Sequence, residues 1–237
     1  MDSEPEPPVV EVTVAAPPAT IWPALRDPEL IKRWHGWHYD GLDEEVAHIY
    51  ASDFTEDAER HTLRLGLETF SLHPAGDSTI VRLTRSPRGA QPEWDAYYDD
   101  ITEGWHTFLR QLRFGIERHD LAERRTLFMA GATDRPAAEL LGLGEAATQP
   151  AGSAYKAALT TGDEWSGTIW DRTDHQVFLT VAEHDDSLLV LASQPLTAER
   201  PAGGSMVLLN AYGFDETGFA DLERRWTAWW STVTVAG

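Results

Sequence analysis

Apolar residues recur at every second position in the first half of the chain, which is the pattern of strands with one buried face. The segments with this period are 9–16, 44–51, 61–66 and 68–86. In 44–51 the period places Val46, His48 and Tyr50 on one face, so we expect His48 and Tyr50 to point the same way. The segment 68–86 contains Pro-Ala-Gly-Asp-Ser between two apolar runs, and it predicts a hairpin.

Helical signals begin directly after the first strand. Pro17 and Pro18 end that strand and suit the first turn of a helix. Pro23 lies where this helix would continue, at a cost of ~3 kcal/mol in a helix interior, so we expect a late start or a kink. Asp27 before Pro28 is an N-cap that predicts a second short helix.

Two long helices are predicted, at 94–119 and at 214–233. In the first, apolar residues recur three or four positions apart and form a broad stripe. They are Ile101, Trp105, Phe108, Leu109, Leu112 and Ile116. The second carries a comparable stripe near the C-terminus. Each long helix follows a series of strands, and a curved antiparallel sheet around a long helix is the simplest way to bury both apolar faces.

The second half repeats the first in part. The segments 70–83 and 178–191 are each fourteen residues long, with Phe first, Leu last and Asp eighth. Further strands are predicted within 164–183 and at 204–212. The opening pair of helices has no counterpart beyond the short 136–143, and 137–154 is rich in small residues, which indicates a linker or a poorly packed connection.

Two segments resemble a known family. Residues 10–34 (VEVTVAAPPATIWPALRDPELIKRW) look like the opening segment, and 99–117 (DDITEGWHTFLRQLRFGIE) like the closing helix, of START-type SRPBCC helix-grip proteins. Within them the similarity is to the branch of the heat-shock chaperone ATPase activator (Aha-type). The resemblance covers about the first 120 residues.

The expected fold class is therefore α+β, with two tandem helix-grip copies, each a curved antiparallel sheet wrapped around a long C-terminal helix. The predicted boundaries are a disordered tail at 1–8, a START-like domain at 9–122, and a second, degenerate copy at 123–237. The resemblance further implies a cavity between sheet and long helix. Members of the family bind lipids or other hydrophobic molecules, cyclise polyketides, or act in stress responses.

Composition removes several classes of function. The net charge is −20 and the pI about 4.7, and such an acidic surface disfavours nucleic acid and anionic membranes as partners. Without cysteine the chain has no disulfide and no thiolate chemistry. The N-terminus is not a signal peptide, and no apolar run reaches the ~20 residues of a membrane span, so we expect no membrane insertion and a cytoplasmic location.

Polar residues give no strong catalytic or metal signal. His35 and His38, with Asp40 nearby, lie on either side of Gly36, and a polar turn beside buried tryptophans explains them better than a metal site. The acidic start of the long helix is typical of solvated carboxylates near a helix N-terminus. We therefore predict no catalytic residue, no metal and no cofactor.

The aromatic residues carry the functional hypothesis, because ten tryptophans are unusual in a chain of 237 residues. We predict a small hydrophobic or aromatic ligand in the first copy. Its expected lining is Trp34, Trp37, Tyr50, Phe70, Trp105, Phe108 and Leu112. In the second copy, where a filled core is favoured, the candidates are Trp170, Phe178, Trp226 and Trp229.

Three functions follow from this hypothesis. The first is a binding module for a hydrophobic small molecule, which would be stress-related if it follows the family. The second is an enzyme of the polyketide cyclase or aromatase kind, for which the shared face of His48 and Tyr50 is the only support. The third is a co-chaperone role with a protein partner that the sequence leaves unknown.

Overall fold

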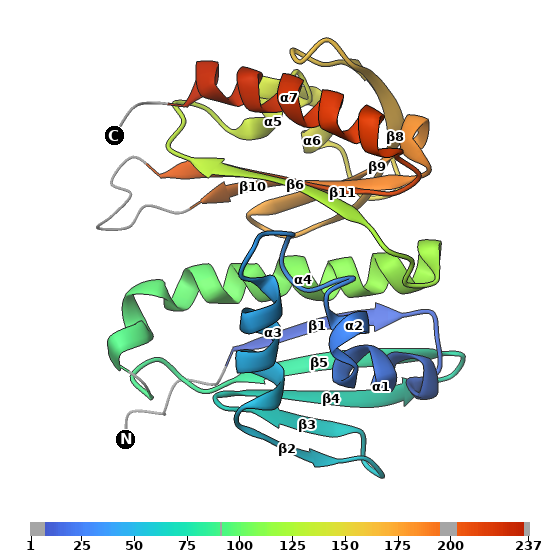
Figure 1. Ribbon diagram of the computed structural model, residues 1–237, viewed down its shortest axis with the longest axis vertical. Coiled ribbons are helices and arrows are strands. Elements are labelled where there is room, and N and C mark those ends of the chain that lie inside the picture. Colours follow the sequence, from blue (N-terminus) through green and yellow to red (C-terminus); the bar gives the residue numbers. More distant parts are fainter. Residues whose placement is uncertain (1–7, 91, 195–202, 235–237) are drawn as a thin grey trace. The chain divides into compact units, whose positions relative to one another are not determined.

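The computed structural model of the chain describes residues 8–90, 92–194 and 203–234. They form two compact units whose boundary falls between Ala122 and Glu123. Apart from Pro8, the predicted tail at 1–8 lies outside the described residues. Each unit has an antiparallel sheet and ends in a long helix, so the predicted α+β class with two tandem copies is confirmed (Figure 1).

The first unit contains five strands. They are β1 (Val9–Val14), β2 (Phe54–Asp57), β3 (Thr62–Leu65), β4 (Glu68–Ala75) and β5 (Ser78–Arg85). Their order across the sheet is β1-β5-β4-β3-β2, and every neighbouring pair is antiparallel. The predicted hairpin is β4–β5, and Phe70 lies opposite Leu83 in its register.

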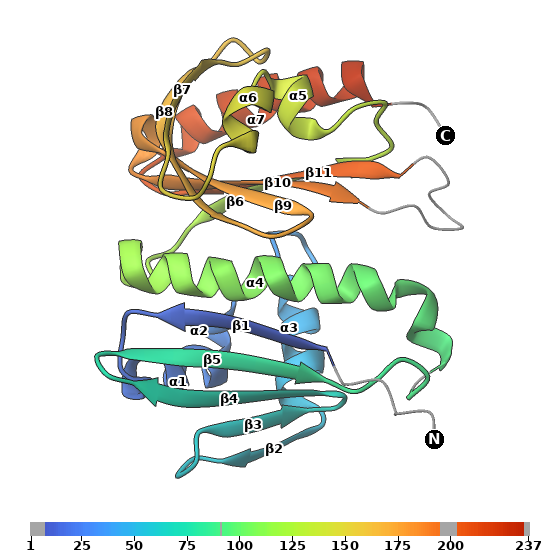
Figure 2. The same ribbon diagram turned by 180° about the vertical axis from the view of Figure 1, so that it is seen from behind.

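The helices of the first unit lie on the inner face of this sheet. They are α1 (Pro18–Arg26), α2 (Pro28–Ile31), α3 (Leu42–Ala51) and α4 (Tyr98–His119), with a 3-10 helix η1 (Pro92–Tyr97) before α4. Helix α4 runs alongside β1, and α1 to α3 cover the neighbouring part of the face (Figures 1 and 2). Pro23 lies inside α1, which begins at Pro18, so the predicted late start is wrong. Asp27 caps α2 as expected, accepting a hydrogen bond from the Glu29 backbone N–H at 2.9 Å.

The strand predicted at 44–51 is wrong, because these residues belong to helix α3. Leu42, Val46 and Tyr50 follow one another at four-residue steps and are buried on one side of the helix. The acidic residues of its first turn favour a helix at this point. His48 is exposed while Tyr50 is buried, so the two side chains do not share a face.

The described residues of the second unit form six strands in the order β6-β11-β10-β9-β8-β7. They are β6 (Arg125–Gly131), β7 (Ala154–Ala158), β8 (Glu164–Arg172), β9 (Gln176–Val181), β10 (Ser187–Gln194) and β11 (Gly204–Ala211). The helices are α5 (Ala137–Leu141), α6 (Gly144–Thr148), the 3-10 helix η2 (Ala182–His184) and α7 (Glu216–Val233). Helices α5, α6 and α7 all lie on one side of the sheet (Figures 1 and 2).

The segment 137–154 is not a poorly packed connection. It forms α5 and α6, and Leu140, Leu141 and Leu143 are buried in the core of the unit. These two helices follow the first strand of the unit, as α1 and α2 follow β1. The second unit therefore has its own short counterpart of the opening helix pair.

The two similar fourteen-residue segments are both hairpins, but they occupy different places in their sheets. The segment 70–83 lies in β4–β5, whose second strand pairs with the first strand of its unit. The segment 178–191 lies in β9–β10, and β11 separates that hairpin from β6. The similar sequences therefore do not occupy equivalent strands. The hairpin of the second unit lies one strand further from the first strand of its unit than the hairpin of the first unit does.

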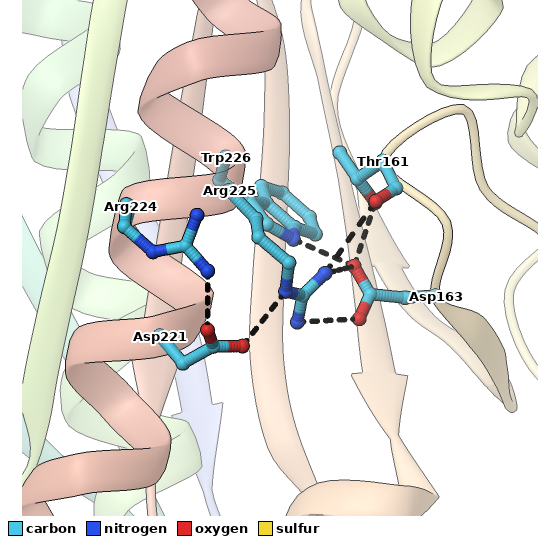
Figure 3. Close-up of polar contacts among 6 residues, drawn as sticks. All are labelled: Thr161, Asp163, Asp221, Arg224, Arg225 and Trp226. Carbon is cyan, nitrogen blue, oxygen red and sulfur yellow. Dashed lines mark hydrogen bonds and ion pairs between the residues drawn. The ribbon is translucent and has the colours of Figure 1, made fainter.

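A polar network fastens α7 to the β7–β8 turn (Figure 3). Asp163 accepts hydrogen bonds from Thr161, from Arg225 at 2.9 Å and from the indole N–H of the buried Trp226 at 2.9 Å. Asp221 also contacts Arg225, but it lies on the exposed side of the helix. Asp163 therefore satisfies a buried donor, and Asp221 does not.

This difference predicts unequal costs for two substitutions. We expect Asp163→Ala to lower the free energy of unfolding of the second unit by about 2–3 kcal/mol, because it leaves the Trp226 N–H and a partly buried guanidinium without their acceptor. Asp221→Ala should cost less than about 1 kcal/mol, as exposed ion pairs do. Urea unfolding of the whole chain, followed through NMR signals of the second unit, measures both. If both substitutions lowered the free energy of unfolding by the same amount, the buried role given to Asp163 would be wrong.

Candidate functional site

The inner face of the first sheet is covered by aromatic rings in direct contact. Phe70 lies edge-to-face with Trp105, with ring centroids 5.5 Å apart, and Trp105 lies 5.7 Å from Phe108. Trp34 contacts Tyr50 at 6.1 Å and donates its indole N–H to the Ala24 carbonyl at 2.8 Å. These distances are typical of favourable aromatic pairs. The rings come from the loop after α2, from α3, from β4 and from α4, and the ring of His35 contacts both groups, so that together they form one continuous wall.

The structure brings most of the predicted ligand-binding residues into this wall. Trp34, Tyr50, Phe70, Trp105 and Leu112 are all buried and belong to one core cluster. Phe108 packs against the same cluster and is only partly buried. Trp37 is half-buried in the loop after α2 and is not part of that cluster.

His35 lies inside the aromatic wall, although the sequence indicated only a polar turn. Its ring is 1% exposed and lies 4.6 Å from Phe108 and 5.8 Å from Trp105. His38 and Asp40 are exposed, so the three polar residues of this loop do not converge. Within the described residues, no group of three or more acidic or histidine side chains is arranged to hold a metal ion.

His35 connects a buried hydroxyl to a partly exposed carboxylate. Its Nδ1 lies 3.0 Å from the Tyr50 hydroxyl, and its Nε2 lies 3.6 Å from Glu45 Oε1, an electrostatic contact rather than a hydrogen bond. Because a carboxylate only accepts, the ring proton belongs on Nε2, and Nδ1 then accepts the Tyr50 O–H. Glu45 also accepts a hydrogen bond from Tyr39 at 2.6 Å.

Burial and nearby charged or hydrogen-bonding groups shift the pKa values of Tyr39, Glu45 and Tyr50. The nearby His35 ring, and with it the Tyr39 hydroxyl, hold the pKa of Glu45 below its usual value although partial burial opposes this. The same hydrogen bond to Glu45 raises the pKa of Tyr39 to about 12. Burial, followed by the charges of Glu45 and Glu68, raises the pKa of Tyr50 well above its usual value. Tyr50 therefore stays protonated at neutral pH.

Helix α4 fixes the backbone around His35. The Gln111 side-chain N–H group donates to the carbonyl of Trp34 at 2.7 Å and to that of Gly36 at 3.2 Å, one residue on either side of His35. Gly36 has φ +55°, a left-handed conformation that lets the chain turn away directly after the histidine. Gln111 and Gly36 together hold the imidazole toward Tyr50.

Arg85, at the end of β5, contacts the start of α4. Its guanidinium is buried and donates to Glu68 at 3.2 Å and to the Tyr98 carbonyl at 2.8 Å. It also lies over the Tyr98 ring, 4.4 Å from the centroid. Arg85 thus balances the charge of Glu68, one of the two carboxylates that act on Tyr50. In the acidic start of α4, Asp99 is exposed and pairs with Arg88 on the surface.

The aromatic residues of the second unit do not form one comparable wall. Trp226 stacks on Trp165 at 4.8 Å and, with Trp229, belongs to the core beneath α7. Phe178 is not part of that core, and its ring contacts Trp170 at 6.4 Å. The four candidates of this half therefore divide into two separate pairs.

Comparison with solved structures finds matches that cover nearly the whole chain, each with a TM-score below 0.5. The di-domain ARO/CYC protein BexL from the BE-7585A biosynthetic pathway is 11% identical, with 98% of this chain and 100% of that chain covered and a TM-score of 0.38. The di-domain ARO/CYC protein StfQ from the steffimycin pathway is 12% identical, with 95% and 94% covered and a TM-score of 0.35. DynU16 from the dynemicin biosynthetic locus is 15% identical, with 96% of each chain covered and a TM-score of 0.31.

These likenesses lie below the similarity at which an activity or a residue role could be carried over. No protein-family model matches the chain, and no curated protein matches it either. The Aha-type branch stays a prediction. None of the helices in the described ranges has the length and the apolar character that a membrane crossing requires.

The lowered pKa of Glu45 predicts a pH-dependent contribution to stability. A carboxyl whose folded pKa is depressed stabilises the fold above its ordinary pKa of about 4.3, and the contribution is lost as the pH falls through the folded value. Relative to Glu45→Gln, the wild-type protein should be more stable at pH 7 by less than about 1 kcal/mol, because Glu45 is partly exposed. The difference should shrink between pH 5 and pH 3.

Urea unfolding at several pH values, read from signals of the first unit, measures this difference. Glu44→Gln on the exposed side of the same helix controls for removing any carboxylate from α3. A difference for Glu45→Gln that does not change with pH would contradict the prediction.

Proposed function

We propose that the first unit binds a small aromatic or otherwise hydrophobic molecule between its sheet and α4. The residues proposed to line the site are Trp34, Trp37, Tyr50, Phe70, Trp105, Phe108 and Leu112. The observation that carries the proposal is the hydrogen-bonded pair His35–Tyr50 inside an aromatic wall. Burying two polar side chains costs free energy that apolar residues of similar size would not cost.

The partly buried residues show where the wall reaches the surface. Phe108, Ile101 and Ile49 pack against the core of the unit and remain partly exposed, while Trp105 and Tyr50 behind them are buried. A ligand that enters between α3 and α4 would displace Phe108 first. It would then meet the Tyr50 hydroxyl and the His35 ring.

The charges around Tyr50 favour a neutral ligand. Glu45 and Glu68 both act on the Tyr50 hydroxyl, and only Glu68 is paired with a buried arginine. An anionic ligand at this place would lie near the Glu45 carboxylate, which is unfavourable in a site of low polarity. A neutral aromatic molecule with one hydroxyl matches both the rings and the His35–Tyr50 pair.

The second candidate function is acid–base catalysis of the cyclase or aromatase kind. Its original support is gone, because His48 and Tyr50 do not share a face. The order Glu45–His35–Tyr50 now favours it, since a carboxylate beside an imidazole that accepts from a hydroxyl is an arrangement that can move a proton. No described contact favours the co-chaperone function.

A pair of related compounds tests the proposed site. We expect 2-naphthol to bind saturably to the whole protein and naphthalene about ten-fold more weakly, because only the hydroxyl of 2-naphthol reaches the His35–Tyr50 pair. Tyr50→Phe should reduce this preference to less than about three-fold. Titrations followed by NMR signals of the first unit, with native mass spectrometry for stoichiometry, measure both affinities.

Tyr97→Phe is the matched control, because Tyr97 is exposed in the same unit. It should leave both affinities unchanged. If neither compound binds saturably, or if Phe108→Ala changes neither affinity, the proposed site is wrong.

A further inference from the structure

The second unit contains a hollow of about 150 Å³ on the side of its sheet that carries α5 and α6. Its lining comes from the start of α5, from α6, from the turn between β8 and β9, and from the end of β10. They include Ala137, Ala138, Ala147, Arg172, Val177 and Leu191. Nothing in the proposed function of the first unit uses this hollow.

One wall of the hollow is apolar. Val177 and Leu191 belong to the same core cluster as Ala137 and Ala138, so the wall is continuous with the interior of the unit. A cavity of about this volume with an apolar lining accommodates a single benzene ring. The hollow is open to solvent, and its apolar wall has room for one six-membered ring.

The rim carries a guanidinium in a fixed position. Arg172 is exposed, yet it donates to the Gln149 carbonyl at 2.8 Å and to the Ala147 carbonyl at 3.3 Å, at the end of α6. A guanidinium has five N–H donors in a rigid plane, so two such bonds leave further donors available. Anchored in this way, Arg172 needs little reordering to bind a carboxylate.

The turn beside Arg172 is also held in one conformation. The Thr173 hydroxyl accepts hydrogen bonds from the backbone N–H groups of His175, at 3.3 Å, and Gln176, at 3.0 Å. The His175 carbonyl accepts from the backbone N–H of Ser193 at 2.9 Å. Asp174 and His175 belong to this turn, are exposed and are among the residues that line the hollow.

We propose that this hollow binds a small monocarboxylate with a single apolar ring, a molecule of the size of benzoate. The ring lies against Val177, Leu191 and the two alanines of α5. The carboxylate lies against the Arg172 guanidinium, with its orientation limited by repulsion from Asp174. This ligand differs in charge and size from the one proposed for the first unit.

Three ligands of similar size and different charge show whether binding depends on the charge of the ligand or only on its shape. Benzoate should bind the whole protein with Kd about 1 mM, as expected for a ligand of nine heavy atoms with one charge-assisted contact. Benzyl alcohol and benzylamine should bind at least about ten-fold more weakly. Chemical-shift changes of the backbone amides of 173–177, followed through an NMR titration, measure all three affinities.

Two variants and a control locate the contact. Arg172→Gln should weaken benzoate about ten-fold and leave benzyl alcohol unchanged. Ala138→Leu, which fills the hollow, should weaken both compounds. Arg224→Gln removes an exposed arginine of the same unit that does not line the hollow, and it should change nothing.

Each contrary result overturns the proposal. No saturable shift at residues 173–177 means that the hollow is not a site. Equal affinity for benzoate and benzyl alcohol, or tighter binding of benzylamine, means that the guanidinium does not select a carboxylate. If Arg172→Gln and Arg224→Gln reduce the affinity for benzoate equally, the affinity depends on the net charge of the protein and not on a contact with Arg172.

Discussion

An open antiparallel sheet with one apolar face is stable only if that face is covered, and this constraint organises each unit of the protein. In the first unit a single helix, α4, runs alongside the edge strand β1 and leaves the remainder of the face to α1, α2 and α3. In the second unit α7 has the same role, with α5 and α6 beside it. Tertiary burial of this kind, rather than local helix propensity, holds such short helices in place.

The same constraint explains how a histidine comes to lie in an aromatic interior. Helix α4 has to place Trp105, Leu109 and Leu112 on the sheet, and Gln111 then lies beside the loop after α2. Its amide binds the backbone carbonyls on both sides of His35, so the loop cannot move away from α4 without losing two buried hydrogen bonds. The polar set is thus attached to the element that closes the core.

Much of the fold could be predicted because its signals are local. The β4–β5 hairpin follows from apolar alternation around a short turn, and Asp27 before Pro28 marks the start of α2. Helix α3 could not be recognised from Val46 and Tyr50, because these two residues satisfy a two-residue and a four-residue period at once. The two periods differ at Glu44 and His48, which a strand would place on the same face as Val46 and Tyr50 and which are exposed in the helix. Most members of the aromatic wall could be predicted from the sequence, because apolar periodicity alone places them on the inner faces of their elements.

The polar part of the site could not be predicted, because its members come from different elements. His35 ends up beside Glu45 and Tyr50 only because the loop turns at Gly36 and α3 is a helix. Read as a strand, 44–51 would have placed His48 rather than His35 next to Tyr50. One wrong period therefore exchanged the histidine on which the proposed site depends.

The displaced repeat shows what the two copies have to preserve. The first unit reaches the far part of its sheet with β2 and β3 and uses α3 over the inner face, whereas the described residues of the second unit contain one more strand and, after α6, no further α-helix before α7. A similar hairpin sequence can occupy either place, because each needs only two apolar faces and a tight turn. Covering the sheet, and not the identity of each strand, is thus the feature that both copies share.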